Sequence, residues 1–412
     1  MTENALSVNL TNMGVDSLIC LFGAHMVKRK IETYLQQTAE NFKVITITGP
    51  RQAGKTTLAK AAFPAHLYYD MDNPLYQIRF QTYPESLFMP RDGKIIFDEY
   101  QNIPTVTHFI KVYADEQNQT GQYILTGRNQ FEYMQNVTQS LAGRTALMKL
   151  FPFSWEEMYA QSNDRMFDCI QRGWYPALLH QGLDTETFYT SYIGTYLERD
   201  IRNLALVKDL AQFRLFLGLC AGRTGAELNK SSLASAAGID VKTVTQWLSL
   251  LETSFVITFL PPFQKNWSKR LTKTPKLYFL DTGLVCSLLG IRDGHTLSNH
   301  PLRGEIFETF VVGEVIKHFA NHGQHPNLYY LRERNGLEID LVIERNARLF
   351  PVQIKSGQTF NASWLDSFKL LNTRSSAFSS PMIVYAGVEE FGISNTRVVS
   401  APRLSSTLST LI

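Results

Sequence analysis

Residues 49–56 have the residue types and the spacing of a phosphate-binding loop. They read Gly-Pro-Arg-Gln-Ala-Gly-Lys-Thr, which matches G-x-x-x-x-G-K-[ST] at every fixed position. The glycines let the backbone turn its N–H groups toward phosphate oxygens, and the N-terminus of a following helix favours anions. Lys55 is expected to reach the β- and γ-phosphates, and the Thr56 hydroxyl to help hold Mg²⁺. The loop therefore predicts that the chain binds a nucleoside triphosphate.

A second apolar segment, residues 94–99, ends in the acids Asp98 and Glu99. Asp98 is expected to orient the Mg²⁺ of bound nucleotide, and Glu99 to position and polarise the attacking water. Paired acids also occur at solvated strand ends, but a P-loop about forty residues earlier favours the catalytic interpretation. The second acid favours hydrolysis over passive binding. The residues predicted to hold the nucleotide are Gly49, Pro50, Arg51, Gln52, Ala53, Gly54, Lys55, Thr56, Thr57 and Asp98.

Three further residues are candidates for sensing the γ-phosphate. Thr126 ends the apolar segment 122–126 and is the candidate polar sensor, with Asn129 as the alternative and an ordinary turn as the third interpretation. Arg144 is a candidate sensing or finger arginine, since a guanidinium matches phosphate geometry. A surface salt bridge explains Arg144 equally well.

The elements that must position these residues alternate between strand and helix. The β-branched run 44–48 precedes the loop, and the helix-favouring run 57–62 follows it. This alternation predicts an α/β fold, with a doubly wound parallel sheet over about residues 26–150. In such a sheet, a strand at 122–126 between those of the loop and the acids would end beside the γ-phosphate.

Several short motifs resemble those of the bacterial and archaeal AAA-type ATPases that carry a C-terminal nuclease-like domain. They are residues 49–57 (GPRQAGKTT), 97–101 (FDEYQ), 125–127 (LTG), 140–144 (SLAGR) and 150–152 (LFP). The resemblance covers nearly the whole chain from Met26 and implies a P-loop domain that uses ATP and Mg²⁺. That family usually has a serine after LTG, where this chain has Arg128.

The middle of the chain has the pattern of a helix-turn-helix. Residues 231–239 read as a capped short helix and a glycine turn, and residues 241–251 as a second helix with one apolar face. Residues 255–260 could form the wing strand of a winged helix. The residues on the polar face of the second helix are Lys242, Thr243, Thr245 and Gln246. Such modules bind DNA, but they also serve as protein-contact or structural modules.

A basic segment follows the predicted wing. Its cations are Lys265, Lys269, Arg270, Lys273 and Lys276, with Trp267 among them. Cations interleaved with an aromatic residue suit a nucleic-acid backbone, and a solvated basic loop is the alternative. Farther upstream, Glu198, Arg199 and Asp200 could contact the nucleotide of a neighbour in a homo-oligomer, although a charge run on a helix is usually solvated.

The C-terminal third resembles the restriction-endonuclease-like fold in one constellation. An amphipathic helix over residues 303–318 carries Glu308, and Asp340, Gln353 and Lys355 fall on one face of two neighbouring predicted strands. The resemblance implies Mg²⁺ held by Glu308, Asp340 and Gln353, with Lys355 offsetting negative charge. Glutamine at 353 replaces the usual glutamate and should weaken the metal. A degenerate domain kept for binding or scaffolding is the alternative.

Composition sets broad limits on the class of protein. The 412 residues are 44% hydrophobic and 19% charged, with a net charge of only +3, so any basic surface must be local. No apolar run approaches the ~20 residues that span a bilayer, so no membrane partner is expected. The scattered cysteines (Cys20, Cys169, Cys220 and Cys286) indicate neither a zinc site nor a disulfide framework, and the expected setting is the cytoplasm.

The predicted domain order follows from these patterns. The segments are an N-terminal extension of unassigned function (1–25), a P-loop AAA-type domain (26–152), a helical linker (153–215), a winged-helix-like domain (216–265), a basic connector (266–302) and a restriction-endonuclease-like domain (303–412). The favoured function is a Mg²⁺-dependent ATPase that couples ATP hydrolysis to DNA binding, with a weak or degenerate nuclease. The alternative is a non-nucleolytic regulatory or scaffold protein.

Overall fold

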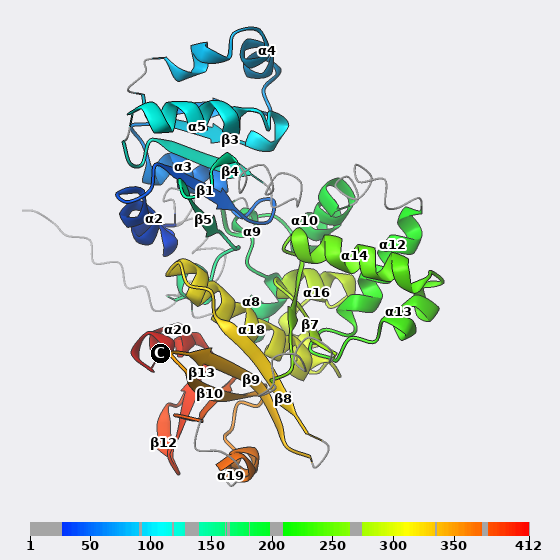
Figure 1. Ribbon diagram of the computed structural model, residues 1–412. Coiled ribbons are helices and arrows are strands. Elements are labelled where there is room, and N and C mark those ends of the chain that lie inside the picture. The colour runs from blue at the N-terminus through cyan, green and yellow to red at the C-terminus, as the bar shows by residue number, and fades with distance from the viewer. Residues whose placement is uncertain are drawn as a thin grey trace, which may run out of the picture.

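The computed structural model describes residues 27–89, 93–117, 119–127, 140–160, 162, 165–180, 182–197, 209–263, 274–333, 336–372 and 378–411. Three parts succeed one another along the chain (Figure 1): a sheet covered by helices, a helical region, and a second sheet near the C-terminus. The long helix of the third part lies at the centre of the molecule and contacts the other two parts.

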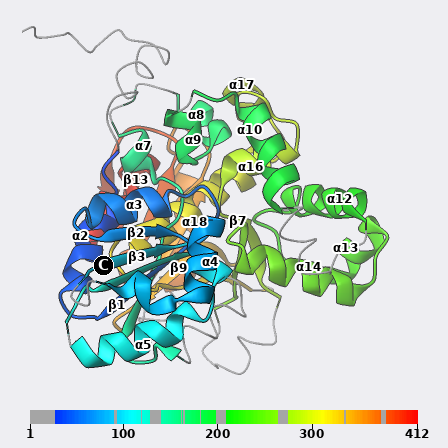
Figure 2. The ribbon, with the colours of Figure 1, turned by 90° about the horizontal axis from the view of Figure 1, so that it is seen from above.

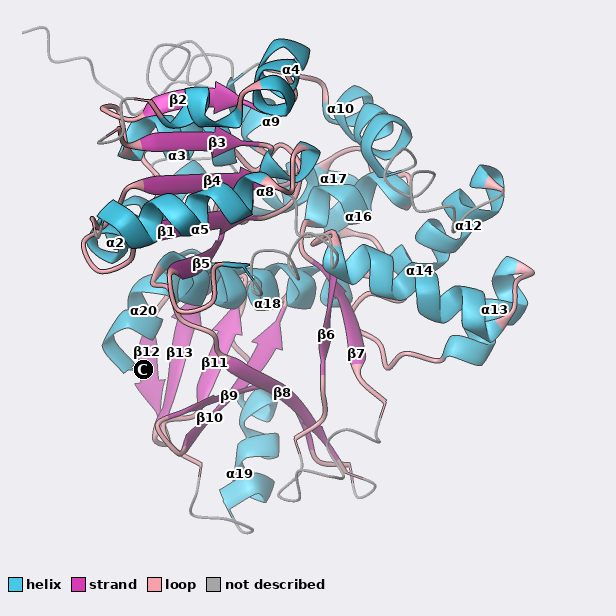
Figure 3. Cartoon of the chain, turned by 45° about the horizontal axis from the view of Figure 1, so that its top comes forward, coloured by secondary structure: helices cyan, strands magenta, loops and turns pink. Residues whose placement is uncertain are grey.

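The first part is built on a five-stranded parallel sheet. Its strands are β1 (Val44–Thr48), β2 (Leu67–Asp70), β3 (Ile95–Asp98), β4 (Tyr123–Gly127) and β5 (Thr145–Lys149). Their order in space is β2-β3-β4-β1-β5 (Figure 3), and every pairing is parallel. β4 therefore lies between the strands of the loop and of the acids, which is the order that the expectation for Thr126 assumed. Since all five strands point the same way, their carboxyl ends form one edge.

Helices cover both faces of this sheet. They are α2 (Ile31–Ala39), α3 (Lys55–Ala62), α4 (Pro74–Thr82) and α5 (Val106–Gln117). Leu35 of α2 and Leu58 of α3 share a core with Ile96, whereas Ile110 of α5 shares a different core with Phe97. Neighbouring residues of β3 thus face opposite helical layers. The prediction of a doubly wound α/β sheet is confirmed.

The middle part is mostly helical. Its helices are α7 (Trp155–Met158), α8 (Met166–Arg172), α9 (Pro176–His180), α10 (Thr185–Tyr192), α12 (Leu210–Ala221), α13 (Lys230–Ala237), α14 (Val241–Thr253), α16 (Thr282–Leu288) and α17 (Gly294–Ser298), with a π-helical turn at Ile193–Leu197. Helices α12, α13 and α14 project to one side (Figure 2). Between α13 and α14, Gly238 has a φ of 66° and Asp240 caps the second helix, as a tight helix-turn-helix requires.

A short hairpin follows α14. Strand β6 (Ile257–Leu260) pairs antiparallel with β7 (Lys276–Phe279), and Glu227 adds a bridge to Lys276. The sequence had assigned residues 276–279 to a basic connector, so this hairpin crosses the predicted boundary at 265. Helices α16 and α17 then return to pack on α8. These long-range pairings could not be read from local residue patterns.

The third part contains a six-stranded mixed sheet. Its strands are β8 (Asn327–Arg332), β9 (Glu338–Arg345), β10 (Arg348–Lys355), β11 (Met382–Tyr385), β12 (Phe391–Ile393) and β13 (Thr396–Ser400), in the order β12-β13-β11-β10-β9-β8. Helix α18 (Arg303–Asn321) packs on one face and α19 (Asp366–Asn372) on the other. The C-terminal α20 (Leu404–Leu411) lies against α18.

One continuous core joins the middle and third parts. It includes Trp174 of the middle part, Phe310 of α18 and Val352 of β10. Within the ranges given above, no helix has the length and hydropathy needed to cross a bilayer. Cys169, Cys220 and Cys286 are buried free thiols, whereas Cys20 lies outside the described residues.

Candidate functional site

The P-loop connects the end of β1 to the start of α3. Gly54 caps the helix with a φ of 91°, a conformation that disfavours other residues, and the amides that follow form the N-terminus of α3. Lys55 is buried, and its Nζ donates to the carbonyl oxygens of Gly49 (3.2 Å) and Pro50 (2.8 Å). The ammonium is therefore held over the loop, where it can reach a phosphate by changing rotamer.

Asp98 at the end of β3 accepts hydrogen bonds from three hydroxyl groups. Thr56 donates to Oδ2 at 2.8 Å, Tyr68 of β2 donates to the same oxygen at 2.7 Å, and Thr126 of β4 donates to Oδ1. Burial and the Asp98 carboxylate raise the pKa of Tyr68, which keeps it a donor. The predicted residues Thr56, Asp98 and Thr126 are thus brought together. A threonine hydroxyl beside a carboxylate is a donor set that suits Mg²⁺, so the residues fit this ion.

Glu99 lies one residue beyond Asp98 in a left-handed conformation, with a φ of 50°. Gln101 Nε2 donates to its carboxylate. Gly127, at the end of β4, makes this arrangement possible. A Cβ atom there would lie 2.3 Å from Gln101 Oε1 and 2.8 Å from Tyr100 Cε1. The motifs FDEYQ and LTG therefore pack against each other, and this packing places Gln101 where it holds the Glu99 carboxylate.

Arg29 supports the P-loop from the beginning of the described chain. Its guanidinium donates to the carbonyl oxygens of Ala53 (2.8 Å) and Phe151 (2.7 Å), and to Glu157 (3.0 Å). Arg29 is 7% exposed, so these bonds are shielded from water. No local pattern indicates this role, because Arg29 stands among other basic residues and its partners lie 24 to 128 positions away.

A pocket of about 770 Å³ opens in front of the loop. The loop lines one side with Arg51, Lys55 and Thr56, and the middle part lines the other with Pro176 and with Tyr192 of α10. Because α9 and α10 belong to the middle part, a ligand on the P-loop would touch two parts of the chain.

Arg144 lies at the opposite edge of the sheet from the P-loop, before the first residue of β5. It forms an ion pair with Asp115, with Nε–Oδ1 at 2.6 Å. The structure therefore makes the salt bridge, and a role as sensor of this chain's own γ-phosphate is not supported by its position. The length of strand β5 separates Arg144 from the edge of the sheet where the P-loop lies. Asn129, the alternative sensor, and Glu198, Arg199 and Asp200 lie outside the described residues.

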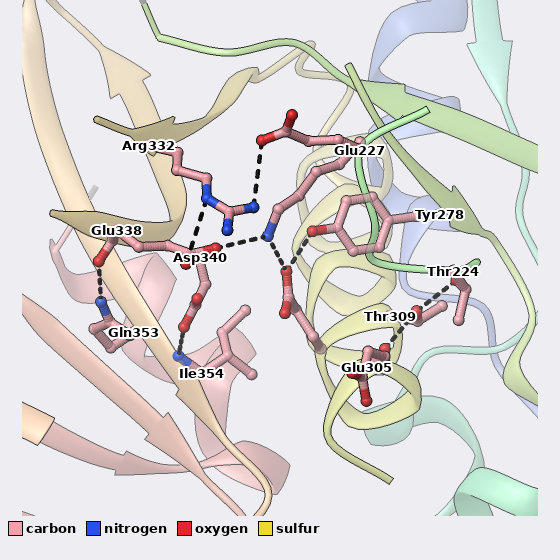
Figure 4. Close-up of polar contacts among 12 residues, drawn as sticks. Thr224, Glu227, Tyr278, Glu305, Thr309, Arg332, Glu338, Asp340, Gln353 and Ile354 are labelled. Carbon is pink, nitrogen blue, oxygen red and sulfur yellow. Dashed lines mark hydrogen bonds and ion pairs between the residues drawn. The ribbon is translucent and has the colours of Figure 1, made fainter. Parts of the chain in front are cut away.

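Polar side chains of β7, α18 and β9 lie close together, among them the labelled Tyr278, Glu338 and Asp340 (Figure 4). Lys276 of β7 donates from Nζ to Glu308 Oε1 on α18 at 3.0 Å and lies 3.6 Å from Glu338 Oε1. Tyr278, two residues along β7, donates to the same oxygen of Glu308. The sequence assigned Lys276 to the basic DNA-contacting segment. That assignment is wrong, since its side chain is 5% exposed and ion-paired.

Asp340 and Gln353 bridge a gap between β9 and β10. Asp340 Oδ2 accepts from the Ile354 amide at 2.7 Å and lies 3.5 Å from Lys355 Nζ, while Gln353 Nε2 donates to the Glu338 carbonyl at 2.6 Å. Each side chain thus satisfies a backbone group of the facing strand (Figure 4). The Gln353 amide has a structural role that a glutamate could not fill, because a carboxylate cannot donate to a carbonyl.

Burial dominates the electrostatics of this cluster. Burial and the neighbouring Asp340 carboxylate raise the pKa of Glu308 to about 7, and burial also raises the pKa of Asp340. Burial alone would lower the pKa of Lys276, but Glu308 and Asp340 raise it overall. Among the described residues, no group of three or more His, Cys, Asp or Glu side chains could hold a metal ion. With an ammonium on Glu308, this arrangement does not fit a divalent metal.

A buried ion pair connects α18 to the segment that follows β5 of the first sheet. Lys317 Nζ donates to Glu314 Oε1 (3.0 Å) and to the Phe153 carbonyl (2.9 Å), and Glu314 Oε2 accepts from the Trp155 amide (2.8 Å). Burial raises the pKa of Glu314, whereas Lys317 and the amide oppose that change. The Phe151 carbonyl accepts a hydrogen bond from Arg29, and the Phe153 carbonyl accepts one from Lys317. This short segment therefore connects the support of the P-loop to α18.

The predicted recognition helix presents its polar residues as expected. On α14, Lys242, Thr245 and Gln246 are exposed and Thr243 is partly exposed, whereas Val244 and Trp247 are buried. The basic residues Lys265, Lys269, Arg270 and Lys273, with Trp267, lie outside the described residues.

Comparison with known proteins defines the class of the first part. Residues 41–159 match the family model described as "AAA domain". With the strand order and the P-loop, this match supports an AAA-type ATPase fold for the first part, and with it ATP binding. Residues 163–295 and 303–404 match two domains of unknown function, DUF8612 and DUF4143. The endonuclease-like resemblance of the C-terminal part stays a prediction.

Two relatives resemble most of the chain. The uncharacterized proteins Mb2031c of Mycobacterium bovis and Rv2008c of Mycobacterium tuberculosis are each 29% identical over 379 residues, which cover 91% of this chain and 83% of the relative. Among solved structures, the Walker-type ATPase paby2304 of Pyrococcus abyssi is 14% identical with a TM-score of 0.42, covering 64% of this chain and 96% of that one. AMPPCP-bound DnaA from Aquifex aeolicus is 14% identical with a TM-score of 0.26, covering 54% and 85%.

Proposed function

We propose that this chain hydrolyses ATP at the P-loop with Mg²⁺ as cofactor. The observation that carries the proposal is the contact of Thr56 with Asp98 (2.8 Å), beside a Glu99 carboxylate fixed by Gln101. Thr56 and Asp98 would hold Mg²⁺, which neutralises charge on the β- and γ-phosphates when bound.

Each residue of this edge has a distinct proposed role. Lys55 leaves the carbonyls of Gly49 and Pro50 to bind the β- and γ-phosphates. Glu99 orients a water molecule for attack, and its partner Gln101 keeps the carboxylate in place. Thr126 fixes Asp98 through its hydroxyl. Its proposed role is therefore to position the aspartate, in addition to any contact with the γ-phosphate.

Nucleotide binding tests the assignment of the loop. Lys55→Ala should lose measurable ATP binding, because it removes the cation that meets the phosphates, and should keep the circular dichroism spectrum of the wild type. Lys111→Ala is the control, since Lys111 of α5 is exposed and does not line the pocket. Equal ATP affinity in wild type and Lys55→Ala would contradict the proposal.

We further propose that the ATPase is coupled to nucleic-acid binding through α14, with DNA as the favoured partner. The exposed polar face of α14, behind a buried apolar face, supports this interpretation. The basic residues Lys269, Arg270 and Lys273 would add contacts to phosphates. ATP bound between the P-loop and α10 would change the position of the helical region relative to the sheet.

DNA binding tests this coupling. Neutralising Lys269, Arg270 and Lys273 together should weaken binding to all sequences alike and flatten its salt dependence, because fewer counterions are released. Lys111→Ala, on the exposed side of α5, is the control. An unchanged salt slope in the triple variant, together with an ATPase rate that DNA does not alter, would refute the coupling.

For the C-terminal domain, the Lys276–Glu308 contact favours a non-nucleolytic role in this conformation over DNA cleavage. A nuclease of the predicted kind needs a metal at Asp340 and Gln353, yet Gln353 bridges two strands and an ammonium lies on Glu308. A domain that binds partners or relays the nucleotide state fits these contacts. Cleavage of DNA by the wild-type protein with Mg²⁺, lost in Asp340→Ala, would restore the nuclease interpretation.

A further inference from the structure

Two side chains beside the P-loop contact the proposed Mg²⁺ site without lining the nucleotide pocket. Tyr68 of β2 lies opposite Ile96 of β3, on the face of the sheet that α3 covers. Its hydroxyl donates to Asp98 Oδ2 at 2.7 Å, and Lys60 Nζ lies 3.5 Å from the centre of its ring. Lys60 follows Thr56 by one helical turn, so both side chains project from the same side of α3. Helix α3 therefore reaches the aspartate by two routes, directly and through the phenol ring.

The Asp98 carboxylate is held from both neighbouring strands. Rotation about the last bond of an aspartate side chain has a broad energy minimum, so hydrogen bonds must fix the plane of the carboxylate. Tyr68 on β2 donates to Oδ2, and Thr126 on β4 donates to Oδ1. In the proposed function Thr56 also contacts Mg²⁺. The two strand hydroxyls are therefore the donors whose only task at this edge is to orient Asp98.

We infer that Tyr68 is a positioning residue for the Mg²⁺ site, and that the Lys60 ammonium holds its ring in place. The inference rests on the Mg²⁺-dependent ATP hydrolysis proposed above, and it adds a residue that acts through Asp98. Hydrogen-bond partners of a metal-ligating carboxylate typically contribute about 10- to 100-fold to metal affinity. The contribution of Lys60 is smaller, because its ammonium is exposed and a cation–π contact is weak in water.

Tyr69 provides a matched comparison for Tyr68. It is the next residue of β2, and its side chain lies with Phe97 in the core on the opposite face of the sheet. Tyr69→Phe therefore removes the same atom from the same strand on the side away from α3. Tyr68→Phe keeps the ring and its packing, so it removes only the hydrogen bond to Asp98.

A labelled, non-hydrolysable ATP analogue tests the inference, titrated into each protein in EDTA and again in Mg²⁺. The ratio of the two affinities measures how strongly the metal supports nucleotide binding. Tyr68→Phe should bind the analogue like wild type in EDTA and lose about 10-fold of the Mg²⁺-dependent gain. Lys60→Met should lose ~3-fold, whereas Lys60→Arg should keep the gain because a guanidinium also stacks on the ring. Tyr69→Phe should match wild type in both conditions.

The Mg²⁺ dependence of phosphate release provides the second readout. The Mg²⁺ concentration for half-maximal rate should rise about 10-fold in Tyr68→Phe, while kcat at saturating Mg²⁺ stays close to that of wild type. Adding Lys60→Met to Tyr68→Phe should cause no further loss, because the lysine acts through the phenol.

Three results would overturn the inference. They are an unchanged or larger Mg²⁺-dependent gain in Tyr68→Phe, an equal loss in Tyr69→Phe, and a loss in EDTA as large as the loss in Mg²⁺, which would mark a purely structural role. A further loss in the double variant would refute the part assigned to Lys60. A wild type that shows the Mg²⁺-dependent gain but releases no phosphate would refute the proposed hydrolysis and not the role of Tyr68. A wild type without that gain would refute both.

Discussion

The packing of Gly127 against Gln101 predicts that one added methyl group will disable hydrolysis. In Gly127→Ala, the new Cβ would fall 2.3 Å from Gln101 Oε1. This is about 1 Å inside ordinary van der Waals contact. Gln101 is buried and must move by a similar amount, which withdraws its Nε2 from Glu99. A misplacement of about 1 Å in a group that orients a reactant costs on the order of 100-fold in rate.

Steady-state phosphate release at saturating ATP measures this effect. We expect kcat of Gly127→Ala to fall roughly 100-fold, while ATP affinity changes little because the P-loop is untouched. Gln101→Ala is the matched variant, since it removes the same hydrogen bond without adding bulk, and its kcat should fall to a similar value. If both act through Glu99, the double variant should be no slower than the single ones.

Two results would refute this reasoning. A Gly127→Ala protein with wild-type kcat would show that Gln101 does not position Glu99. A double variant whose loss is the product of the two single losses would show that Gly127 and Gln101 act independently. Thermal melting of each variant distinguishes a lost contact from a lost fold.

Three further predictions concern the groups that hold the parts together. Lys317→Met leaves Glu314 buried without its cation and should lower the free energy of unfolding by about 3–5 kcal/mol, as measured by urea denaturation, with partial recovery when Glu314→Gln is added; an unchanged midpoint would contradict it. Arg29→Met removes the donor to the Ala53 carbonyl and should weaken ATP binding at least ~10-fold in a titration with labelled ATP, because the loop loses its support; wild-type affinity would exclude that role. Since the pKa of Glu308 is raised from 4.5 to about 7, the native state keeps a proton that the unfolded chain has released between these values. The stability of wild type should therefore fall relative to Glu308→Gln as the pH rises through this range, by on the order of 2–3 kcal/mol; a pH-independent difference would contradict the assignment.

Sequence reasoning predicted those parts of the site whose residues are contiguous in the chain. The P-loop, the acids at the end of β3 and the sheet itself follow from local patterns, because strand period and loop chemistry are local properties. Once the strand order is known, Thr56, Asp98 and Thr126 are expected to lie close together, because parallel strands end at the same edge of the sheet. The sequence could therefore predict the residues at this edge of the sheet, but not their support by Arg29 or Tyr68.

The contacts that sequence reasoning missed join residues far apart in the chain. Lys276 meets Glu308 across 32 positions, so its basic type suggested DNA contact and its burial could not be foreseen. The sequence suggests that Gln353 is a weakened metal ligand. In the structure its Nε2 donates to the Glu338 carbonyl, which lies where β9 and β10 no longer pair. From the sequence alone, Arg144 could be a phosphate-contacting arginine or part of a surface salt bridge. The fold places it beside Asp115. The deciding fact is burial for Lys276, a backbone carbonyl for Gln353 and the neighbouring Asp115 carboxylate for Arg144.

The turnover of Glu99→Gln tests the central claim, that this edge of the sheet hydrolyses Mg²⁺-ATP, most directly. The substitution keeps the size and hydrogen-bonding capacity of the side chain but removes the carboxylate that orients water. Phosphate release and ATP affinity should be measured on the same sample, with wild type and Lys55→Ala beside it. The account predicts that Glu99→Gln binds ATP as tightly as wild type and hydrolyses it at least ~100-fold more slowly. Equal turnover by wild type and Glu99→Gln would contradict it.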